Sequence, residues 1–332
     1  MSETQGFEQF DTKFFIEGTK VMINWTNFDE LKSYSELQNV KKVELKEVMA
    51  GENGAERVKK YSVPMAAGFS FNYAAKAVDD DVLAALKNLA EEAQLAEKYA
   101  ALYNGEVINT GEKRLVLHQL TRGQLGDTVT ADGVDKRKFY VGEQNKIAAF
   151  ANDVHVGKIV NEAGEKFTTV VQIGIGGSDL GPRAIYIALE NWARKNNTLK
   201  MEAKFISNVD PDDAAAVLNS IDVAHSLFVL VSKSGTTLET LTKEAFVKDA
   251  LKNVGLDPAN HMVAVTSETS PLAKNEGYLD AFYMDNYIGG RYSSSSAVGC
   301  AVLSLAFGPK VFADFLDGAA AEDKLACEKD VM

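Results

Sequence analysis

Hydroxyl side chains are concentrated in one short stretch of the chain. Four hydroxyls, one lysine and one glycine occur in the run Ser232-Lys233-Ser234-Gly235-Thr236-Thr237, between an apolar run and a helical pattern. That placement is typical of loops that bind ligands at the carboxyl ends of strands in open α/β sheets. Hydroxyls and backbone amides can bind several phosphate oxygens at once, whereas a helix cap would account for only one or two of these residues. The pattern therefore favours a phosphate-binding loop over a simple cap.

A glycine-rich turn occurs earlier in the chain. Three glycines precede a serine in the run Gly174-Ile175-Gly176-Gly177-Ser178, again between an apolar run and a helical pattern. Glycine lets the backbone approach a ligand closely, and the amides at a helix N-terminus favour an anion. A dinucleotide-binding motif would need a glycine where Asp179 stands, and a P-loop would need G-K-[ST], which is absent. We expect an anion at Gly177 and Ser178, with a purely connecting turn as the alternative.

The third candidate is Arg291, which follows two glycines within the run Asp285-Asn286-Tyr287-Ile288-Gly289-Gly290-Arg291-Tyr292-Ser293. The glycines would let the guanidinium project from a tight turn, where it could stabilise developing negative charge. Without the other two motifs, a solvated loop arginine would be the simpler interpretation.

The elements that must position these residues follow from the hydrophobic pattern. From about residue 166, apolar runs alternate with helical patterns, which is typical of parallel βαβ units. The expected strands are 167–175, 201–206, 226–231, 262–266 and a weaker 281–284, and the expected helices are 179–195, 212–221, 237–254 and 270–277. We predict an α/β fold with a doubly wound, flavodoxin-like parallel sheet of five strands. In that strand order the first and third strands are neighbours, so the glycine-rich turn and the hydroxyl loop would face one pocket.

The chain is expected to have three parts. Residues 1–150 form a mostly helical N-terminal region, with helices at 79–102 and 145–160 and loops over 104–132. Residues 151–310 form the α/β domain that carries the three motifs, and 311–332 are the helical start of a further part. Residues 330–332 carry no stop signal of their own, so we expect the natural protein to continue.

Bulk composition restricts the setting. A formal net charge of −12 disfavours non-specific binding to nucleic acid or to anionic membranes. Two cysteines, Cys300 and Cys327, are too few for a disulfide framework or a four-ligand zinc site. Residues 1–10 lack a signal-peptide pattern, and the longest apolar stretch, 297–307, is too short to cross a membrane. We therefore expect a cytoplasmic protein with no metal and no nucleic-acid or membrane partner.

Taken together, the three motifs closely resemble the glucose-6-phosphate isomerase (phosphoglucose isomerase) family, in its N-terminal portion with the first sugar-isomerase (SIS) domain. The matching stretches are 173–182 (IGIGGSDLGP), 232–240 (SKSGTTLET) and 289–293 (GGRYS), with 296–299 just after and 104–118 upstream. The resemblance covers roughly residues 65–310. It departs from the family at Gly235, where many relatives carry Phe.

The resemblance implies an aldose–ketose isomerase that interconverts glucose 6-phosphate and fructose 6-phosphate through an enediolate, without a cofactor. It implies that Gly177 and Ser178 contact the substrate and that Arg291 stabilises the enediolate. The residues that it places around the phosphate are Ser232, Lys233, Ser234, Gly235, Thr236 and Thr237. It also implies a homodimer for the full-length form.

The same resemblance implies that catalytic groups are missing. In the family, the glutamate base and an assisting histidine and lysine lie downstream of GGRYS, in motifs that this sequence does not contain. None of the histidines matches the family's histidine motif; they are His118, His155, His225 and His261. The three loops offer hydroxyls, amides and one arginine, but no obvious base for proton abstraction next to a carbonyl. We therefore expect the 332-residue chain to bind sugar phosphate with little turnover.

Two other functions remain open on the sequence. A non-catalytic SIS-type module could bind a sugar phosphate as a sensor, although residues 1–150 show no basic recognition helix of the kind a regulator would carry. A nucleotide-binding oxidoreductase is disfavoured because the glycine spacing fails at Asp179.

Overall fold

The computed structural model describes residues 22–274 and 276–327. Within this range the chain forms two compact units: unit 1 contains 22–115, 124–127 and 318–327, and unit 2 contains 116–123 and 128–317. The expected domain boundary at residue 150 falls inside a helix of unit 2, and the three-part division stays a prediction. Residues 1–10 and 330–332, on which two expectations rest, lie outside the described residues.

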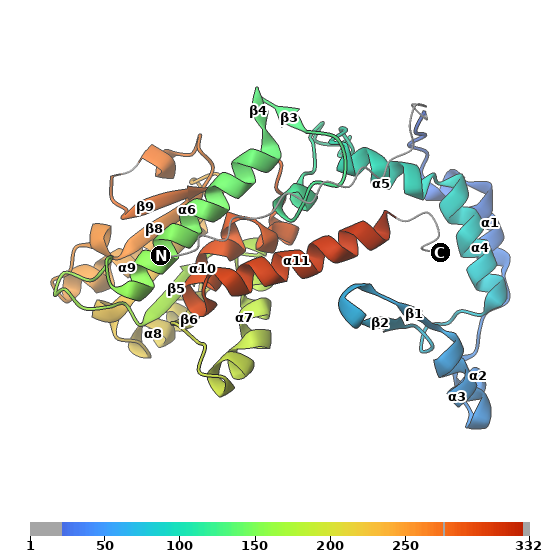
Figure 1. Cartoon of the computed structure of the whole chain (residues 1–332), viewed down its shortest axis with the longest axis horizontal. Helices are drawn as coiled ribbons and strands as arrows, with labels where there is room; N and C mark the ends of the chain where they lie inside the picture. The colour runs from blue at the N-terminus through green and yellow to red at the C-terminus, as the bar shows by residue number, and fades with distance from the viewer. Residues whose placement is uncertain (1–21, 275, 328–332) are drawn as a thin grey trace, which may run out of the picture. The chain divides into compact units, whose positions relative to one another are not determined.

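Unit 2 contains the expected five-stranded parallel sheet (Figure 1). Its strands are β5 (Thr169–Ile173), β6 (Glu202–Ile206), β7 (Ser226–Val231), β8 (Met262–Thr266) and β9 (Asp280–Tyr283). They lie in the order β6-β5-β7-β8-β9, with every neighbouring pair parallel. Strands β5, β7 and β8 are buried at every position, as strands covered on both faces must be. The flavodoxin-like prediction is confirmed, and β5 and β7 are neighbours at the switch point.

Helices cover both faces of the sheet. One apolar core joins the sheet to α6 (Lys136–Val156), α7 (Gly177–Lys195), α10 (Ala297–Phe307) and the start of α11 (Pro309–Ala326). The other core joins it to α8 (Pro211–Asn219) and α9 (Leu238–Asn253). Every residue of α10 is buried, which explains why its sequence is apolar on all sides. In the described part of the chain, no helix is both long and apolar enough to cross a membrane.

The helices of unit 2 begin in two ways. Side-chain oxygens of Asp135, Asp210 and Ser296 accept hydrogen bonds from backbone amides and cap α6, α8 and α10. By contrast, the N-cap residues of α7 and α9, Gly176 and Thr237, make no side-chain cap bond. These are the two helices that follow the predicted ligand loops. Their first turns therefore lack the side-chain oxygen that ordinarily satisfies the N-terminal amides.

Unit 1 is mostly helical. Its helices are α1 (Lys32–Asn39), α2 (Leu45–Val48), α3 (Gly51–Lys60), α4 (Asp80–Glu92) and α5 (Leu95–Tyr103), and β1 (Ser62–Pro64) pairs with β2 (Ser70–Asn72) in an antiparallel hairpin. The prediction of a single helix over 79–102 is wrong, because the helix is interrupted at Gln94, whose backbone φ of 53° lies in the left-handed region. The side-chain amide of Gln94 donates from Nε2 to the backbone carbonyl of Met22, and its Oε1 accepts from the backbone amide of Asn24.

Other expectations for short segments needed correction. The helix expected over 270–277 is only a 3-10 turn, Pro271–Lys274, and the one expected over 145–160 begins earlier and ends at Gly157, whose φ is 81°. The segment expected to be loops, 104–132, contains a 3-10 helix, η3 (His118–Thr121), and β3 (Thr130–Ala131), which pairs with β4 (Val134–Asp135). The remaining 3-10 turns are Phe28–Glu30, Ala66–Gly68, Val223–His225, Pro258–Asn260 and η7 (Gly290–Ser295).

Candidate active site

The loop that carries Arg291 is held by its own backbone carbonyls. Four consecutive carbonyls, those of residues 287–290, accept hydrogen bonds from four different residues. The pairs are Leu117 N to Tyr287 O at 3.1 Å, Lys233 Nζ to Ile288 O at 3.2 Å, His118 Nε2 to Gly289 O at 2.8 Å and Ser293 Oγ to Gly290 O at 2.7 Å. The donors come from the η3 region, the hydroxyl loop and η7 itself. The turn before Arg291 is thus fixed from several sides.

The glycine-rich turn packs directly on this loop. A Cβ atom added at Gly177 would overlap the carbonyl of Gly290 and lie 2.8 Å from the amide nitrogen of Arg291. The Ser293 hydroxyl also lies 3.3 Å from the carbonyl oxygen of Gly177. Only glycine permits this approach of one backbone to another. The motif glycine at 177 therefore brings the start of α7 against the Arg291 turn.

Ser178 is fixed from beneath by the sheet. Gln172 lies on β5, is fully buried, and donates from Nε2 to the carbonyl of Ser178 at 2.6 Å. This bond explains why a polar side chain lies in an otherwise apolar strand: the Gln172 amide anchors the first turn of α7. The next residue, Asp179, is buried and forms an ion pair with Arg183 at 2.8 Å. Burial raises the pKa of Asp179, which Arg183 opposes, so this carboxyl is engaged in structure and is a poor candidate for the missing base.

The hydroxyl loop is organised by its own side chains. Ser232 is buried, and its Oγ accepts from the amide of Gly235 at 3.2 Å, while the Ser234 Oγ accepts from the amide of Thr236 at 3.2 Å. Gly235 has a φ of 65°, and a Cβ there would overlap Ser270 Oγ. A larger side chain at this position would therefore need a different local packing.

The hydroxyls of this loop differ in what they offer to a ligand. Ser234, Thr236 and Thr237 are exposed and bond to one another through the Ser234 hydroxyl, whereas Ser232 is buried and bonds the amide of Gly235. The Thr237 hydroxyl does not cap α9, and it lies 3.4 Å from the Ser234 hydroxyl. The alternative interpretation, a plain N-cap, therefore fails at Thr237. An anion here would meet exposed hydroxyls beside a helix start without a side-chain cap.

Positive charge gathers where the loops meet. Lys233 reaches the loop of Arg291 through its bond to Ile288. Burial lowers the pKa of His118, the bond to Gly289 opposes this, and the positive charges of Arg122, Lys233 and Arg291 lower it further. In a chain of net charge −12, these three cations beside one imidazole form a local positive field suited to an anion. The sequence analysis missed Arg122 as a neighbour; its only signal was the spacing of four residues from His118.

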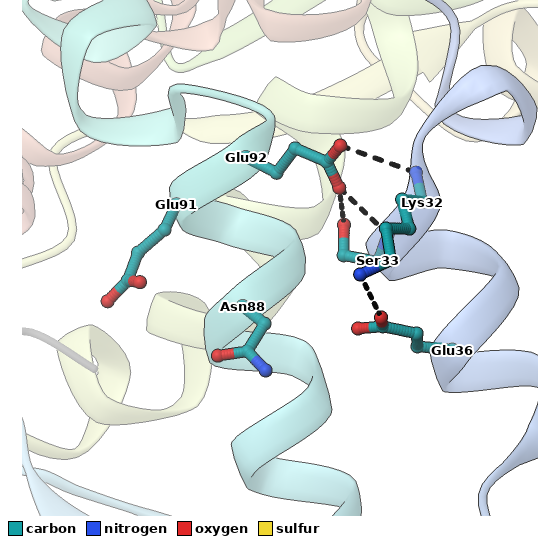
Figure 2. Close-up of a pocket in the computed structure, with 6 residues that line it drawn as sticks. All are labelled: Lys32, Ser33, Glu36, Asn88, Glu91 and Glu92. Carbon is teal, nitrogen blue, oxygen red and sulfur yellow. Dashed lines mark hydrogen bonds and ion pairs between the residues drawn. The ribbon is translucent and has the colours of Figure 1, made fainter.

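A hollow lies in unit 1 and contains none of the predicted site residues. Figure 2 shows it between α1 and α4, lined by Lys32, Ser33, Glu36, Asn88, Glu91 and Glu92. Glu92 is already engaged, because its carboxylate accepts from the Ser33 amide at 2.8 Å and from the Ser33 hydroxyl. Three carboxylates in the lining repel phosphate. This hollow is a helix-to-helix seam and a poor candidate for a sugar-phosphate site.

Comparison with known proteins identifies the family. The family described as phosphoglucose isomerase matches residues 72–330. The chain is 56% identical over 314 residues to the glucose-6-phosphate isomerase of Treponema denticola, covering 93% of this chain and 59% of that protein. It is 43% identical to the glucose-6-phosphate isomerase of Borreliella afzelii, covering 93% and 58%.

A solved structure shows the same relationship. The crystal structure of a glucose-6-phosphate isomerase from Chlamydia trachomatis superposes with a TM-score of 0.78 at 37% identity, covering 91% of this chain and 57% of that one. The chain thus spans less than three fifths of the length of these relatives. Residues 72–330, matched by the family, include all three loops described above. The chain belongs to the phosphoglucose isomerase family.

Proposed function

We propose that this chain supplies the substrate-binding loops of an enzyme that interconverts glucose 6-phosphate and fructose 6-phosphate. One observation carries the proposal: the Arg291 loop contacts both of the other motifs. Its backbone packs against Gly177 of the glycine-rich turn, and its Ile288 carbonyl accepts a 3.2 Å hydrogen bond from Lys233 of the hydroxyl loop. Three segments that are far apart in sequence thus meet at the carboxyl ends of β5, β7 and β9, the edge of the sheet where open α/β sheets bind ligands.

The proposed division of labour follows the chemistry of the groups. The exposed hydroxyls of Ser234, Thr236 and Thr237, with the amides at the start of α9, bind the phosphate. Gly177 and Ser178 contact the sugar, and the close packing of Gly177 on the backbone of Gly290 brings them beside Arg291. Arg291 stabilises the negative charge of the enediolate, for which a guanidinium carried on a fixed backbone turn is well suited. Lys233 adds positive charge while it braces the Arg291 loop, and Ser232 and Gly235 shape the phosphate turn.

Proton transfer between C1 and C2 needs a base within hydrogen-bond reach of the carbon. The sequence holds no match to the family's base motif, so we propose that this chain binds the sugar phosphate but turns it over poorly by itself. The name shared by the relatives supports an isomerase over a sensor module. A homodimer in the cytoplasm, without nucleic-acid or membrane partners, belongs to the same proposal.

Titration calorimetry of the chain with fructose 6-phosphate tests the binding function. Thr237→Ala and Ser234→Ala each remove one protein hydroxyl that would bond the charged phosphate. Each should weaken affinity roughly 10- to 150-fold, since a hydrogen bond to a charged group contributes roughly 1.5–3 kcal/mol. Thr242→Ala is the matched control, because Thr242 lies on the same helix and its hydroxyl bonds only to the carbonyl of Leu238. Equal affinity in all variants would remove the phosphate-loop assignment.

An isomerisation assay on the same preparations tests the second half. We expect fructose 6-phosphate to bind while its conversion to glucose 6-phosphate stays near the uncatalysed rate. Rapid conversion would mean that a base lies within this chain, contrary to the proposal.

A further inference from the structure

His118 contacts the Arg291 loop but has no part in the function proposed above. It opens the 3-10 helix η3, and its ring nitrogen Nε2 lies 2.8 Å from the carbonyl oxygen of Gly289. A Cβ added at Gly289 would lie 3.4 Å from the imidazole Cε1, so the backbone of the turn rests against the ring. The ring also meets Tyr292 edge-on, at 6.1 Å between centroids and 83° between planes. One imidazole thus contacts the residues on either side of Gly290 and Arg291.

The helix that carries His118 is itself anchored. The Thr121 hydroxyl lies 2.7 Å from the Ser295 hydroxyl, and Gln144 of α6 donates to the carbonyl of Thr121 at 2.7 Å. Hydrogen bonds from η3 therefore hold the Arg291 loop on both sides of Arg291: His118 bonds Gly289 before it, and Thr121 bonds Ser295 after it. Because α6 is packed in the main core, this arrangement ties the arginine turn to the rigid part of unit 2.

The protonation state of His118 follows from the geometry. A carbonyl oxygen can only accept, so Nε2 must carry the hydrogen. Burial lowers the pKa of the ring and so disfavours a second proton; the bond to Gly289 opposes this, and the neighbouring cations, Arg122, Lys233 and Arg291, add to the lowering. The neutral imidazole therefore donates to Gly289 without adding charge beside the guanidinium.

We propose that His118 is a positioning residue, whose neutral imidazole holds the Gly289–Gly290 turn so that Arg291 meets negative charge developing on the sugar. This inference rests on the proposed function, since Arg291 must face the reacting end of a sugar phosphate. Misplacing a charged group by a small distance strongly weakens its interaction with developing charge. Loss of the His118 bond should therefore weaken binding of ligands charged at that end more than binding of neutral ones.

Two ligands separate this role from general support of the fold. 6-Phosphogluconate carries a carboxylate at C1, whereas sorbitol 6-phosphate carries the same phosphate with no charge at C1. The ratio of their affinities reports the contribution of Arg291, and it does not depend on the fraction of protein that is folded. Calorimetry would measure both for the wild-type chain, His118→Asn, His118→Gln and Arg291→Ala.

The two amide variants differ in reach. A glutamine amide can extend as far as Nε2 and donate to Gly289, whereas an asparagine amide ends near the position of Nδ1. We expect His118→Asn to lower the affinity ratio about tenfold, close to the value for Arg291→Ala, because a small displacement of a charged group costs much of its effect. His118→Gln, which keeps the bond to Gly289, should leave the ratio within about twofold of the wild-type value. The matched control is His155→Gln: His155 also bonds a backbone carbonyl, Leu305 O at 2.8 Å, and should leave the ratio unchanged.

The outcomes are distinct. A ratio that is unchanged in His118→Asn, or that falls equally in both amide variants, would overturn the positioning role. So would equal losses of affinity for both ligands, because general loosening of the site affects them alike. If the wild-type chain binds neither ligand, the proposed function itself fails, and that result differs from every outcome that concerns His118 alone.

Discussion

Replacing Gly177 with alanine would place a methyl group where two loops already touch. The added Cβ would overlap the carbonyl of Gly290 and sit 2.8 Å from the amide nitrogen of Arg291. Both are backbone atoms held by other bonds, including that of Ser293 to Gly290 at 2.7 Å, so neither can yield by a rotamer change. Overpacking of this kind costs roughly 1–3 kcal/mol. We expect the free energy of unfolding to fall by about that amount and binding of fructose 6-phosphate to be lost or weakened more than tenfold.

Urea denaturation followed by tryptophan fluorescence would measure the stability change. The chain has two tryptophans, and Trp192 lies on α7, the helix that begins at Gly177. In a Trp25→Phe background, the signal reports α7 alone. Gly142→Ala on α6 is the control, because a Cβ there meets nothing within 4 Å and should stabilise the helix by about 0.5–1 kcal/mol. If Gly177→Ala were as stable as Gly142→Ala and bound ligand normally, the packing of the glycine-rich turn on the Arg291 loop would be refuted.

Three further predictions concern the framework of unit 2. Lys136→Met should lower the free energy of unfolding by roughly 3–5 kcal/mol, because it leaves Asp285, whose carboxylate lies 3.1 Å from the lysine Nζ, buried without its ion pair. The control is Lys138→Met, which breaks the more exposed pair with Asp135 and should cost less than about 1 kcal/mol. Equal losses of stability for the two variants in urea denaturation would contradict this prediction. The pKa of His118 is lowered by burial, so its neutral form contributes stability that is complete above the unfolded pKa of about 6.5 and is lost as pH falls through the folded pKa. Wild type should therefore lose more stability than His118→Gln between about pH 7 and 5, and parallel stability curves would rule this out. Burial raises the pKa of the Cys300 thiol to about 12, so iodoacetamide should label Cys300 only after unfolding; labelling of the native chain, found by peptide mass spectrometry, would show that α10 opens.

The sheet of unit 2 could be predicted because its signals are local. Apolar runs of five or six residues, each followed by a helical pattern, indicate buried parallel strands, and the structure places β5 and β7 side by side as expected. The glycine-rich turn and the hydroxyl loop were recognisable because glycine and short hydroxyl residues are unusual at that density. Thr237 illustrates a choice that the sequence left open: the same residue could cap α9 or face a ligand, and only the structure shows that it makes no cap bond.

Features that depend on distant partners were not predictable. The break between α4 and α5 occurs at Gln94, which is neither glycine nor proline, and its amide bonds to residues about seventy positions away in the chain. The support of the Arg291 loop by His118 joins residues 171 positions apart, with no local pattern to reveal it. The stretch 270–277 has a helical pattern, yet among its described residues, which exclude 275, only Pro271–Lys274 forms a 3-10 turn. Ser270 and Leu272 of this stretch pack against Gly235 of the hydroxyl loop.

A crystal structure of this chain with fructose 6-phosphate would show directly whether the hydroxyl loop binds the phosphate. We predict that the phosphate lies within hydrogen-bond reach of the exposed hydroxyls of Ser234, Thr236 and Thr237, with the opposite end of the sugar toward Arg291. A phosphate bound elsewhere, with the hydroxyl loop empty at saturating ligand, would contradict it.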